Sequence, residues 1–399
     1  DTAANTFGST VSFVGVGGTL GNVSIVDDTA LDLQALTITG DLVAMGAGLV
    51  QSGALSVGGT STLTSTGSGN DILLAGANDF GTSLLITTDA TTGSDATLVD
   101  TTSVSLGTSS VGGLLEVTGP GIDVTGNVSA GSLDLDASGG ALTDTGGDLS
   151  VTGTATLTVT TTDVLTLDAV TNDFGTVLLS SGTGAVTLVD ADDIDLGAST
   201  LGGTLDVTAT TSDITDSGAV DVTSAATFTA GTGTNVILDT AANTFGSTVS
   251  FVASAGTLAD VTIVDDTVLD LQALTITGDL VATGAGLTQS GAIVVATGTS
   301  TLTVTTTDLL TLDNAANDFD TVLLSSGTGT VTLVDADDID LGASSVGGAL
   351  NVTATSGAIT DSGAVDVTGA ATFTAGTNVI LDTAANTFGS TVSFVGVGG

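Results

Sequence analysis

Two segments of the chain carry its densest groups of carboxylates. Residues 189–197 and 334–342 both read VDADDIDLG. Successive side chains of a strand point to opposite faces, so we expect Asp193 and Asp195 on the outer face and Ile194 and Leu196 inside. Calcium binds about six to eight oxygen ligands from carboxylates, carbonyls and water. The sequence therefore predicts calcium as a candidate cofactor, with these candidate ligands: Asp190, Asp193, Asp195, Asp335, Asp338 and Asp340.

Simple solvation of an acidic outer face, which also discourages lateral association, is the alternative interpretation of these carboxylates. We predict that the chain requires no cofactor.

The charge of the chain excludes several classes of function. Its 399 residues include 44 acidic side chains and no Lys, Arg or His, so the formal net charge is −44. No cation is present to meet a phosphate, and no stretch is apolar enough to span a bilayer, so we expect neither a nucleic-acid partner nor membrane insertion. The absence of Cys and His excludes thiol catalysis and Cys/His metal sites. Because no basic side chain could tune a carboxylate, we also predict that the chain is not an enzyme.

A short mark, Asn-x-Phe, recurs along the chain and is interpreted as structural. Its copies lie about 70 residues apart, except for one spacing of about 94. We expect Asn and the Gly that usually follows Phe to occupy left-handed turn positions, and Phe to fill the core. Asn side chains are expected to hydrogen-bond to their equivalents in neighbouring coils. The residues concerned are Asn5, Phe7, Asn78, Phe80, Asn172, Phe174, Asn243, Phe245, Asn317, Phe319, Asn386 and Phe388.

Longer repeats organise the whole chain. Residues 1–55 return at 239–293, and residues 190–232 return at 335–377. Alternating runs such as VTLVD from Val331 and LNVTAT from Leu350 begin about 20 residues apart and are bounded by turn residues. Helical periodicity is absent. These features predict an all-β fold, a parallel β-solenoid of about 20 residues per coil, and we expect its right-handed form.

Tandem β-sandwich repeats are the alternative fold, but they would need more aromatic core residues and more Pro in their linkers than this chain has. The solenoid interpretation predicts one continuous repeat rod over residues 1–399. Residues 1–18 recur identically as 382–399. We therefore expect the chain to be an excerpt of a longer repeat array.

The segment 345–376 reads SVGGALNVTATSGAITDSGAVDVTGAATFTAG. It resembles the β-strand repeats of very large bacterial surface proteins, the filamentous-haemagglutinin-like exoproteins and giant adhesins, and the resemblance covers essentially the whole chain. It implies secretion through an outer membrane and a long right-handed β-helical fibre. It also implies roles in attachment, biofilm matrix or cell–cell contact.

We therefore expect a structural role outside the cell, as a rigid, acidic, protease-resistant rod in a cell-surface adhesin or biofilm-matrix protein. A self-assembling filament or sheath, joined end to end or laterally by divalent cations, is the alternative. Thr-rich stretches from Thr152 and Thr297 also raise an ice- or carbohydrate-binding module as a further alternative. The expected partners are other copies of the chain and divalent cations.

Overall fold

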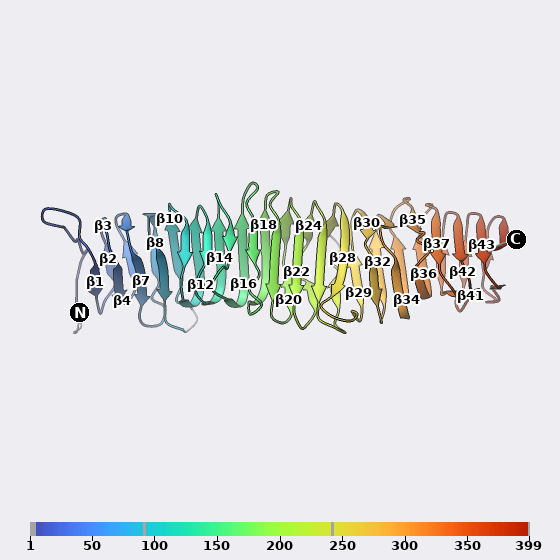
Figure 1. Cartoon of the computed structure of the whole chain (residues 1–399), viewed down its shortest axis with the longest axis horizontal. Helices are drawn as coiled ribbons and strands as arrows, with labels where there is room; N and C mark the ends of the chain where they lie inside the picture. Colours follow the sequence, from blue (N-terminus) through green and yellow to red (C-terminus); the bar gives the residue numbers. More distant parts are fainter. Residues whose placement is uncertain (1–4, 91–92, 241–242, 398–399) are drawn as a thin grey trace. The chain divides into compact units, whose positions relative to one another are not determined.

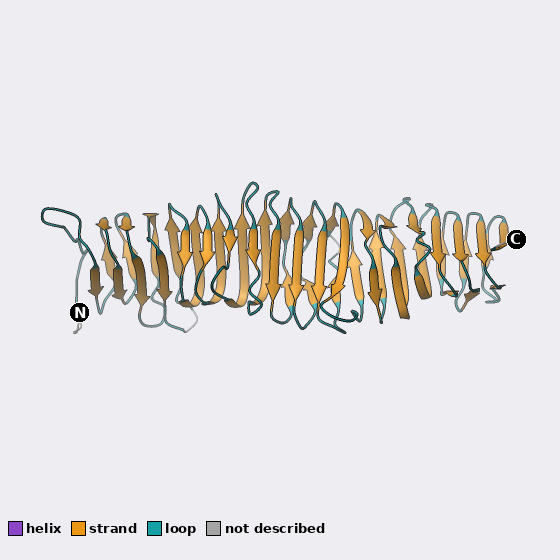
Figure 2. Cartoon of the chain, in the orientation of Figure 1, coloured by secondary structure: helices purple, strands orange, loops and turns teal. Residues whose placement is uncertain are grey.

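The computed structural model describes residues 5–90, 93–240 and 243–397, so the first residues of both copies of the 1–55 repeat fall partly outside the described residues. The chain divides into two compact units, residues 1–191 and 192–399, which are described separately. Strands and loops make up the described part of both units, where no helix occurs (Figure 2). Consistent with this, none of these residues forms a helix long and apolar enough to cross a membrane.

In the first unit, strands follow one another turn upon turn from the blue to the green part of the chain (Figure 1). The strands of this unit are β1 (Val23–Val26), β2 (Leu31–Leu33), β3 (Leu36–Ile38), β4 (Leu42–Gly46), β5 (Leu49–Gln51), β6 (Leu55–Val57), β7 (Thr60–Ser65), β8 (Ile72–Asn78), β9 (Ser83–Thr87), β10 (Ala96–Asp100), β11 (Val104–Leu106), β12 (Ser109–Gly119), β13 (Ile122–Val124), β14 (Val128–Ala137), β15 (Leu142–Thr143), β16 (Leu149–Val159), β17 (Leu165–Leu167), β18 (Asp173–Ser181) and β19 (Val186–Asp190).

The second unit is built in the same way. Its strands are β20 (Ile194–Leu196), β21 (Ser199–Leu201), β22 (Leu205–Ala209), β23 (Ile214–Asp216), β24 (Val220–Val222), β25 (Ala226–Ala230), β26 (Val236–Leu238), β27 (Thr244–Phe245), β28 (Thr248–Ala253), β29 (Val261–Val264), β30 (Val268–Leu271), β31 (Leu274–Ile276), β32 (Leu280–Gly284), β33 (Gly286–Gln289), β34 (Ile293–Val304), β35 (Leu310–Leu312), β36 (Asp318–Ser326), β37 (Val331–Asp335), β38 (Ile339–Leu341), β39 (Ser344–Val346), β40 (Leu350–Ala354), β41 (Ile359–Asp361), β42 (Val365–Val367), β43 (Ala371–Ala375), β44 (Val379–Ile380), β45 (Thr387–Phe388) and β46 (Val392–Gly396).

Each strand pairs in parallel with a strand of a neighbouring turn. In the second unit, β37, β40, β43 and β46 stack in one register, with Val331 opposite Leu350, Leu350 opposite Ala371 and Ala371 opposite Val392. The fold is a parallel β-solenoid of about 18 turns with about 21 residues per turn. The predicted fold class is therefore confirmed. The sandwich alternative was wrong, because it requires antiparallel hairpins rather than parallel pairing between turns.

The core follows the predicted alternation of period two. In β37 the residues alternate between buried and half-buried, and β40 and β43 repeat the pattern. Aromatic rings extend it from turn to turn: Phe228 stacks on Phe251 of the next turn, with ring centroids 5.9 Å apart, and meets Phe245 edge-on at 6.0 Å. Offset and edge-on ring pairs of this kind add to the stabilisation that burial alone provides.

Candidate functional site

The two acidic segments fold as predicted on their outer side. Ile194 and Leu196 are buried, Asp193 is exposed and Asp195 is half-buried. In the second copy Asp338 is exposed and its Oδ1 accepts a hydrogen bond from the backbone N–H of Ala358 at 2.6 Å. Asp340 accepts hydrogen bonds from the hydroxyls of Thr360 and Ser362.

The first Asp of each segment lies elsewhere. Asp190 and Asp335 end strands β19 and β37, and both are fully buried. The two oxygens of Asp335 accept backbone N–H groups, from Phe319 at 2.7 Å and from Asp337 at 2.9 Å. Both residues thus lie directly before a bend, and their burial separates them from the outer face on which Asp193 and Asp338 lie.

Within the described ranges, no three acidic side chains converge in a way that could hold a metal ion. The carboxylates of Asp335, Asp338 and Asp340 instead bind N–H and O–H groups of their own chain. Calcium binding at the predicted ligands is therefore not supported by a preformed site, and it stays a prediction.

The Asn-x-Phe mark forms the most regular polar cluster of both units. Its Asn is fully buried at Asn78, Asn172, Asn243 and Asn317. Each of these side chains accepts, through Oδ1, the backbone N–H of the first residue of a strand in the preceding turn. The donors and distances are Leu55 (2.9 Å), Leu149 (2.8 Å), Val220 (2.8 Å) and Ile293 (2.9 Å), and Val365 donates to Asn386 at 2.8 Å.

The amide nitrogen of each Asn donates to a polar side chain of that same preceding turn. At two copies the partner is Gln, and the two amides bind each other reciprocally: Gln51 with Asn78 at 2.9 Å in both directions, and Gln289 with Asn317 at 2.8 and 2.9 Å. At the other copies the partner is a carboxylate: Asp144 at 2.8 Å, Asp216 at 2.7 Å and Asp361 at 2.5 Å. Hydrogen bonds to a charged acceptor are stronger than those between neutral groups.

The turn that follows completes the cluster. The backbone N–H of Phe80 donates to Asp100 at 2.8 Å, and the backbone carbonyl of Asn78 accepts the N–H of Thr101 at 2.7 Å. The same pair of bonds recurs at the other three inner copies, where the Phe–Asp distances are 2.8 Å (Phe174–Asp190), 3.3 Å (Phe245–Asp265) and 2.7 Å (Phe319–Asp335). We call this unit of Gln or Asp, Asn-x-Phe and buried Asp the asparagine corner. Each one binds three successive turns together.

Next to the corner, the backbones of two successive turns approach so closely that only Gly fits. A Cβ built on Gly53 would lie 2.3 Å from the backbone nitrogen of Ala35 in the preceding turn. The equivalent distances are 2.3 Å at Gly218, 2.2 Å at Gly291 and 2.2 Å at Gly363. No side chain larger than hydrogen fits there without moving the backbone, so the turns can stack this closely only with Gly.

Two expectations about the mark were wrong. Asn side chains do not bond to their equivalents, because copies about three turns apart cannot be neighbours, and other residue types occupy the adjacent turns. The left-handed backbone occurs only at Gly81 among the Asn and Gly residues of the described copies. The Gly in Asn-x-Phe-Gly serves elsewhere for close approach: a Cβ on Gly246 would meet the carbonyl oxygen of Thr223 at 2.7 Å.

The prediction that Phe fills the core is confirmed for the four inner copies: Phe80, Phe174, Phe245 and Phe319 are at most 2% exposed. The outer copies are less covered. Phe7 is 39% exposed, and Asn5, Asn386 and Phe388 are half-buried. Asn5 still donates to the carbonyl of Val26, at 3.1 Å. The burial of a corner therefore depends on having a turn on each side.

Burial also changes the acidity of the corner carboxylates. Burial raises the pKa of Asp335 from 3.8 to about 6, even though the N–H groups of Phe319 and Asp337 favour the charged form. Burial likewise raises the pKa of Asp265 and of Asp144, against the opposing effect of their hydrogen bonds. Removing a carboxylate from water disfavours its charge, and no cation of this chain can offset that cost.

The sequence reasoning missed the Gln or Asp partner and the Asp that follows. A signal for the first is present: a phrase of Gln or Asp, Ser or Thr, and Gly precedes each inner Asn, at residues 51–53, 144–146, 216–218 and 289–291. The second is marked by an Asp at the end of an alternating run, as in VTLVD. The distance from either phrase to its Asn is about one turn.

The profile of a protein family described as "Repeats of unknown function (DUF5649)" matches five segments of the chain, residues 20–87, 118–181, 183–252, 258–326 and 328–395. Each matched segment contains one Asn-x-Phe together with its Gln or Asp partner. No curated protein and no solved structure matches the chain.

We predict that Asn78→Ala lowers the free energy of unfolding by at least about 2 kcal/mol, because the buried N–H of Leu55 and the amide of Gln51 lose their partner. Denaturant unfolding followed by circular dichroism measures the change. Asn127→Ala is the matched control in the same unit, since that side chain is exposed and should change stability by no more than about 0.5 kcal/mol. Equal effects of the two substitutions would contradict the role of the corner.

We predict that the second unit becomes more stable as the pH falls from 7 to 4. A carboxyl whose pKa is raised in the folded state binds its proton more tightly there, so its stabilisation is complete below pH 3.8 and is lost as the pH rises through about 6. For Asp335 the difference corresponds to about 3 kcal/mol. The measurement is the unfolding free energy across this pH range.

Asp335→Asn should flatten that pH profile between about pH 4 and 6, whereas Asp366→Asn, which removes one exposed carboxylate, should leave its slope nearly unchanged. If the unfolding free energy of the wild type instead decreases as the pH falls from 7 to 4, burial of these charged carboxylates does not destabilise the folded state.

Proposed function

We propose that this chain, which belongs to the DUF5649 family of repeats of unknown function, is a structural segment of an extracellular fibre or stalk. It holds other parts of a cell-surface or biofilm-matrix protein at a distance. The observation that carries the proposal is the asparagine corner, whose Asn and Gln or Asp partner recur once in every matched repeat and bind groups of their own chain.

The chemistry of the corner supports a mechanical role. Its donors and acceptors are buried and bind one another across three turns, so they are not free to act on a substrate. Stacked turns with continuous backbone ladders must be separated turn by turn, which makes a solenoid resistant to local opening. The absence of Lys and Arg also leaves no cleavage site for trypsin-like proteases. The resemblance to giant bacterial surface proteins supports a location outside the cell.

A filament or sheath bundled by divalent cations is the second candidate, and one observation favours it. Glu116 and Asp134 stand opposite each other in adjacent turns, with Asp136 two residues further along the same strand. Burial, and then the charges of Glu116 and Asp136, raise the pKa of Asp134. A divalent cation shared between two chains would relieve this repulsion.

If the chain acts as a stalk, its function should depend on the length of the solenoid more than on any single turn. Deleting residues 190–334 joins Val189 to Asp335 and restores the run VTLVD, so the repeat phase is kept while about seven turns are removed. In the producing cells, we expect the shortened protein to stay exposed on the cell surface, as antibody labelling of intact cells would show. We expect attachment of these cells to surfaces to weaken. Labelling that requires permeabilised cells would contradict the extracellular assignment.

The filament candidate predicts bundling by calcium. Light scattering and electron microscopy of the purified chain should then show bundles in millimolar calcium that dissolve on chelation, and none in sodium chloride of equal ionic strength. Glu116→Gln combined with Asp134→Asn should raise the calcium concentration needed. If calcium leaves the chain dispersed at every concentration, the stalk is the better description.

A further inference from the structure

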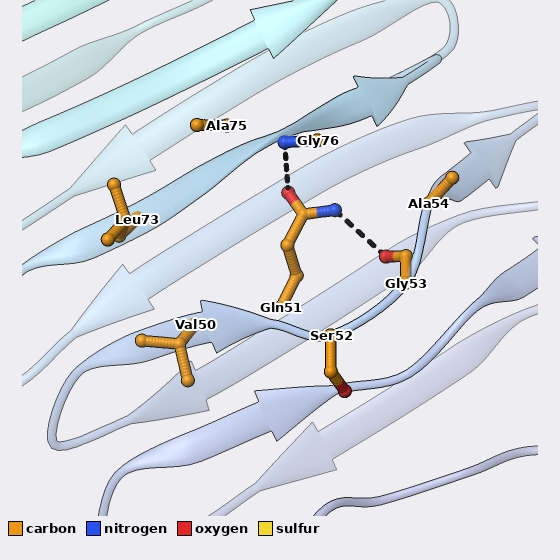
Figure 3. Close-up of a pocket in the computed structure, with 8 residues that line it drawn as sticks. All are labelled: Val50, Gln51, Ser52, Gly53, Ala54, Leu73, Ala75 and Gly76. Atoms are coloured by element: carbon orange, nitrogen blue, oxygen red, sulfur yellow. Dashed lines mark hydrogen bonds between the residues drawn. The ribbon is translucent and has the colours of Figure 1, made fainter.

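An unusual pair of apolar side chains lies on the outer surface of the first unit. Val50 in β5 is 39% exposed and Leu73 in β8 is 51% exposed, and the two stand opposite each other in adjacent turns. They line a shallow groove of about 440 Å³ whose remaining surface comes from Gln51 and from small residues, among them Gly53, Ala75 and Gly76. Figure 3 shows Val50 and Leu73 at one side of this groove.

The floor of the groove is held in place by Gln51. Its amide oxygen accepts the backbone N–H of Gly76 at 3.1 Å, and its amide nitrogen donates to the carbonyl of Gly53 at 2.8 Å (Figure 3). The same side chain forms the reciprocal amide pair with buried Asn78. Because the corner fixes Gln51, the groove is preformed and would lose little conformational freedom on binding.

Carboxylates flank the apolar pair on both sides. In register across successive turns, the outer surface presents Asp32, Val50, Leu73, Thr97 and Glu116, which we call the outer row. One oxygen of Asp32 is buried without a hydrogen-bond partner. Turns are about 4.8 Å apart, so the two carboxylates lie roughly 19 Å from each other with the apolar pair between them.

The repeat itself provides a comparison. The second copy of this segment has Asp270 opposite Thr288, where the first has Asp32 opposite Val50. Leu287 pairs with Leu310, so the residue that follows in the next turn is Thr311 rather than an equivalent of Leu73. Thr at both positions is compatible with the fold. The apolar pair in the first unit is therefore not needed for stacking.

We propose that the outer row is a docking site for a basic segment of another polypeptide, in which two apolar residues lie between two cationic ones. Charge complementarity favours a basic partner, because the chain has a net charge of −44 and no cation of its own. A second copy of the chain would be repelled. An extended segment of about seven residues spans the roughly 19 Å between Asp32 and Glu116. Its alternate side chains, about 6.7 Å apart, would place Lys or Arg at the two carboxylates, one apolar group between Val50 and Leu73, and the other between Leu73 and Thr97.

The test uses the peptide Lys-Ser-Leu-Ser-Leu-Ser-Lys with blocked termini, titrated into the whole chain by fluorescence anisotropy of an attached dye. We expect saturable binding that weakens about tenfold when both Leu are replaced by Ser. Combining Val50→Thr with Leu73→Thr should weaken binding of the Leu peptide to a similar extent. Circular dichroism should show unchanged unfolding of this variant, because Thr is already accommodated at the second copy.

A matched gain of function completes the test. In the second copy the outer row continues through Thr332 to Asn351, which stands where Glu116 stands in the first unit. Thr288→Val combined with Thr311→Leu and Asn351→Glu therefore rebuilds the whole row beside Asp270 and should add a second site, seen as a doubled stoichiometry. Because exposed ion pairs weaken with salt, the difference between the two peptides should persist when the ionic strength is raised. Equal affinity of the Leu and Ser peptides, or of the wild type and Val50→Thr with Leu73→Thr, would overturn the proposal and leave binding by general charge attraction only.

Discussion

The interior of this protein has to satisfy carboxylates and amides without a single cationic side chain. In most proteins a buried Asp can be neutralised by Arg or Lys, but here the available donors are backbone N–H groups, hydroxyls and side-chain amides. Asp335 shows the result: it is fully buried, and its two oxygens are bound by the backbone of Phe319 and Asp337. Asp337 belongs to the same turn as Asp335, but Phe319 belongs to the preceding turn, so this part of the polar interior depends on the stacking of turns.

This dependence makes the turns mutually supporting. The side chain of Asn78 binds Leu55 and Gln51 in the preceding turn, while its backbone carbonyl binds Thr101 in the next. Nearest-neighbour contacts account for the stability of ordinary solenoids. A corner that couples three turns extends this coupling further along the chain. The half-buried state of Asn386, whose corner lacks a described following turn, shows how much of the burial is supplied by neighbours.

The sequence predicted the fold well and the polar cluster poorly, for a physical reason. Alternation of apolar residues, as in VTLVD and LNVTAT, specifies strand positions locally, and its recurrence sets the turn length at close to the observed value of about 21 residues. The corner depends on contacts between residues that are about one turn apart, such as Gln51 with Asn78. Their pairing follows from the register of the turns, which a motif of three residues does not reveal. The apolar pair Val50 and Leu73 was missed for the same reason.

Because each corner extends over three turns, it restricts where the gene can gain or lose the coding sequence for a turn. The first inner corner occupies residues 51–100 and the second residues 144–190, and the long spacing of the Asn-x-Phe copies arises in the interval between them. This interval includes the end of the unmatched stretch between residues 87 and 118. Recombination that adds or removes a turn between corners leaves every buried amide with its partners, whereas the same event inside a corner would separate them. Inherited variation in length should therefore accumulate between corners, and the corner itself should pass intact from copy to copy.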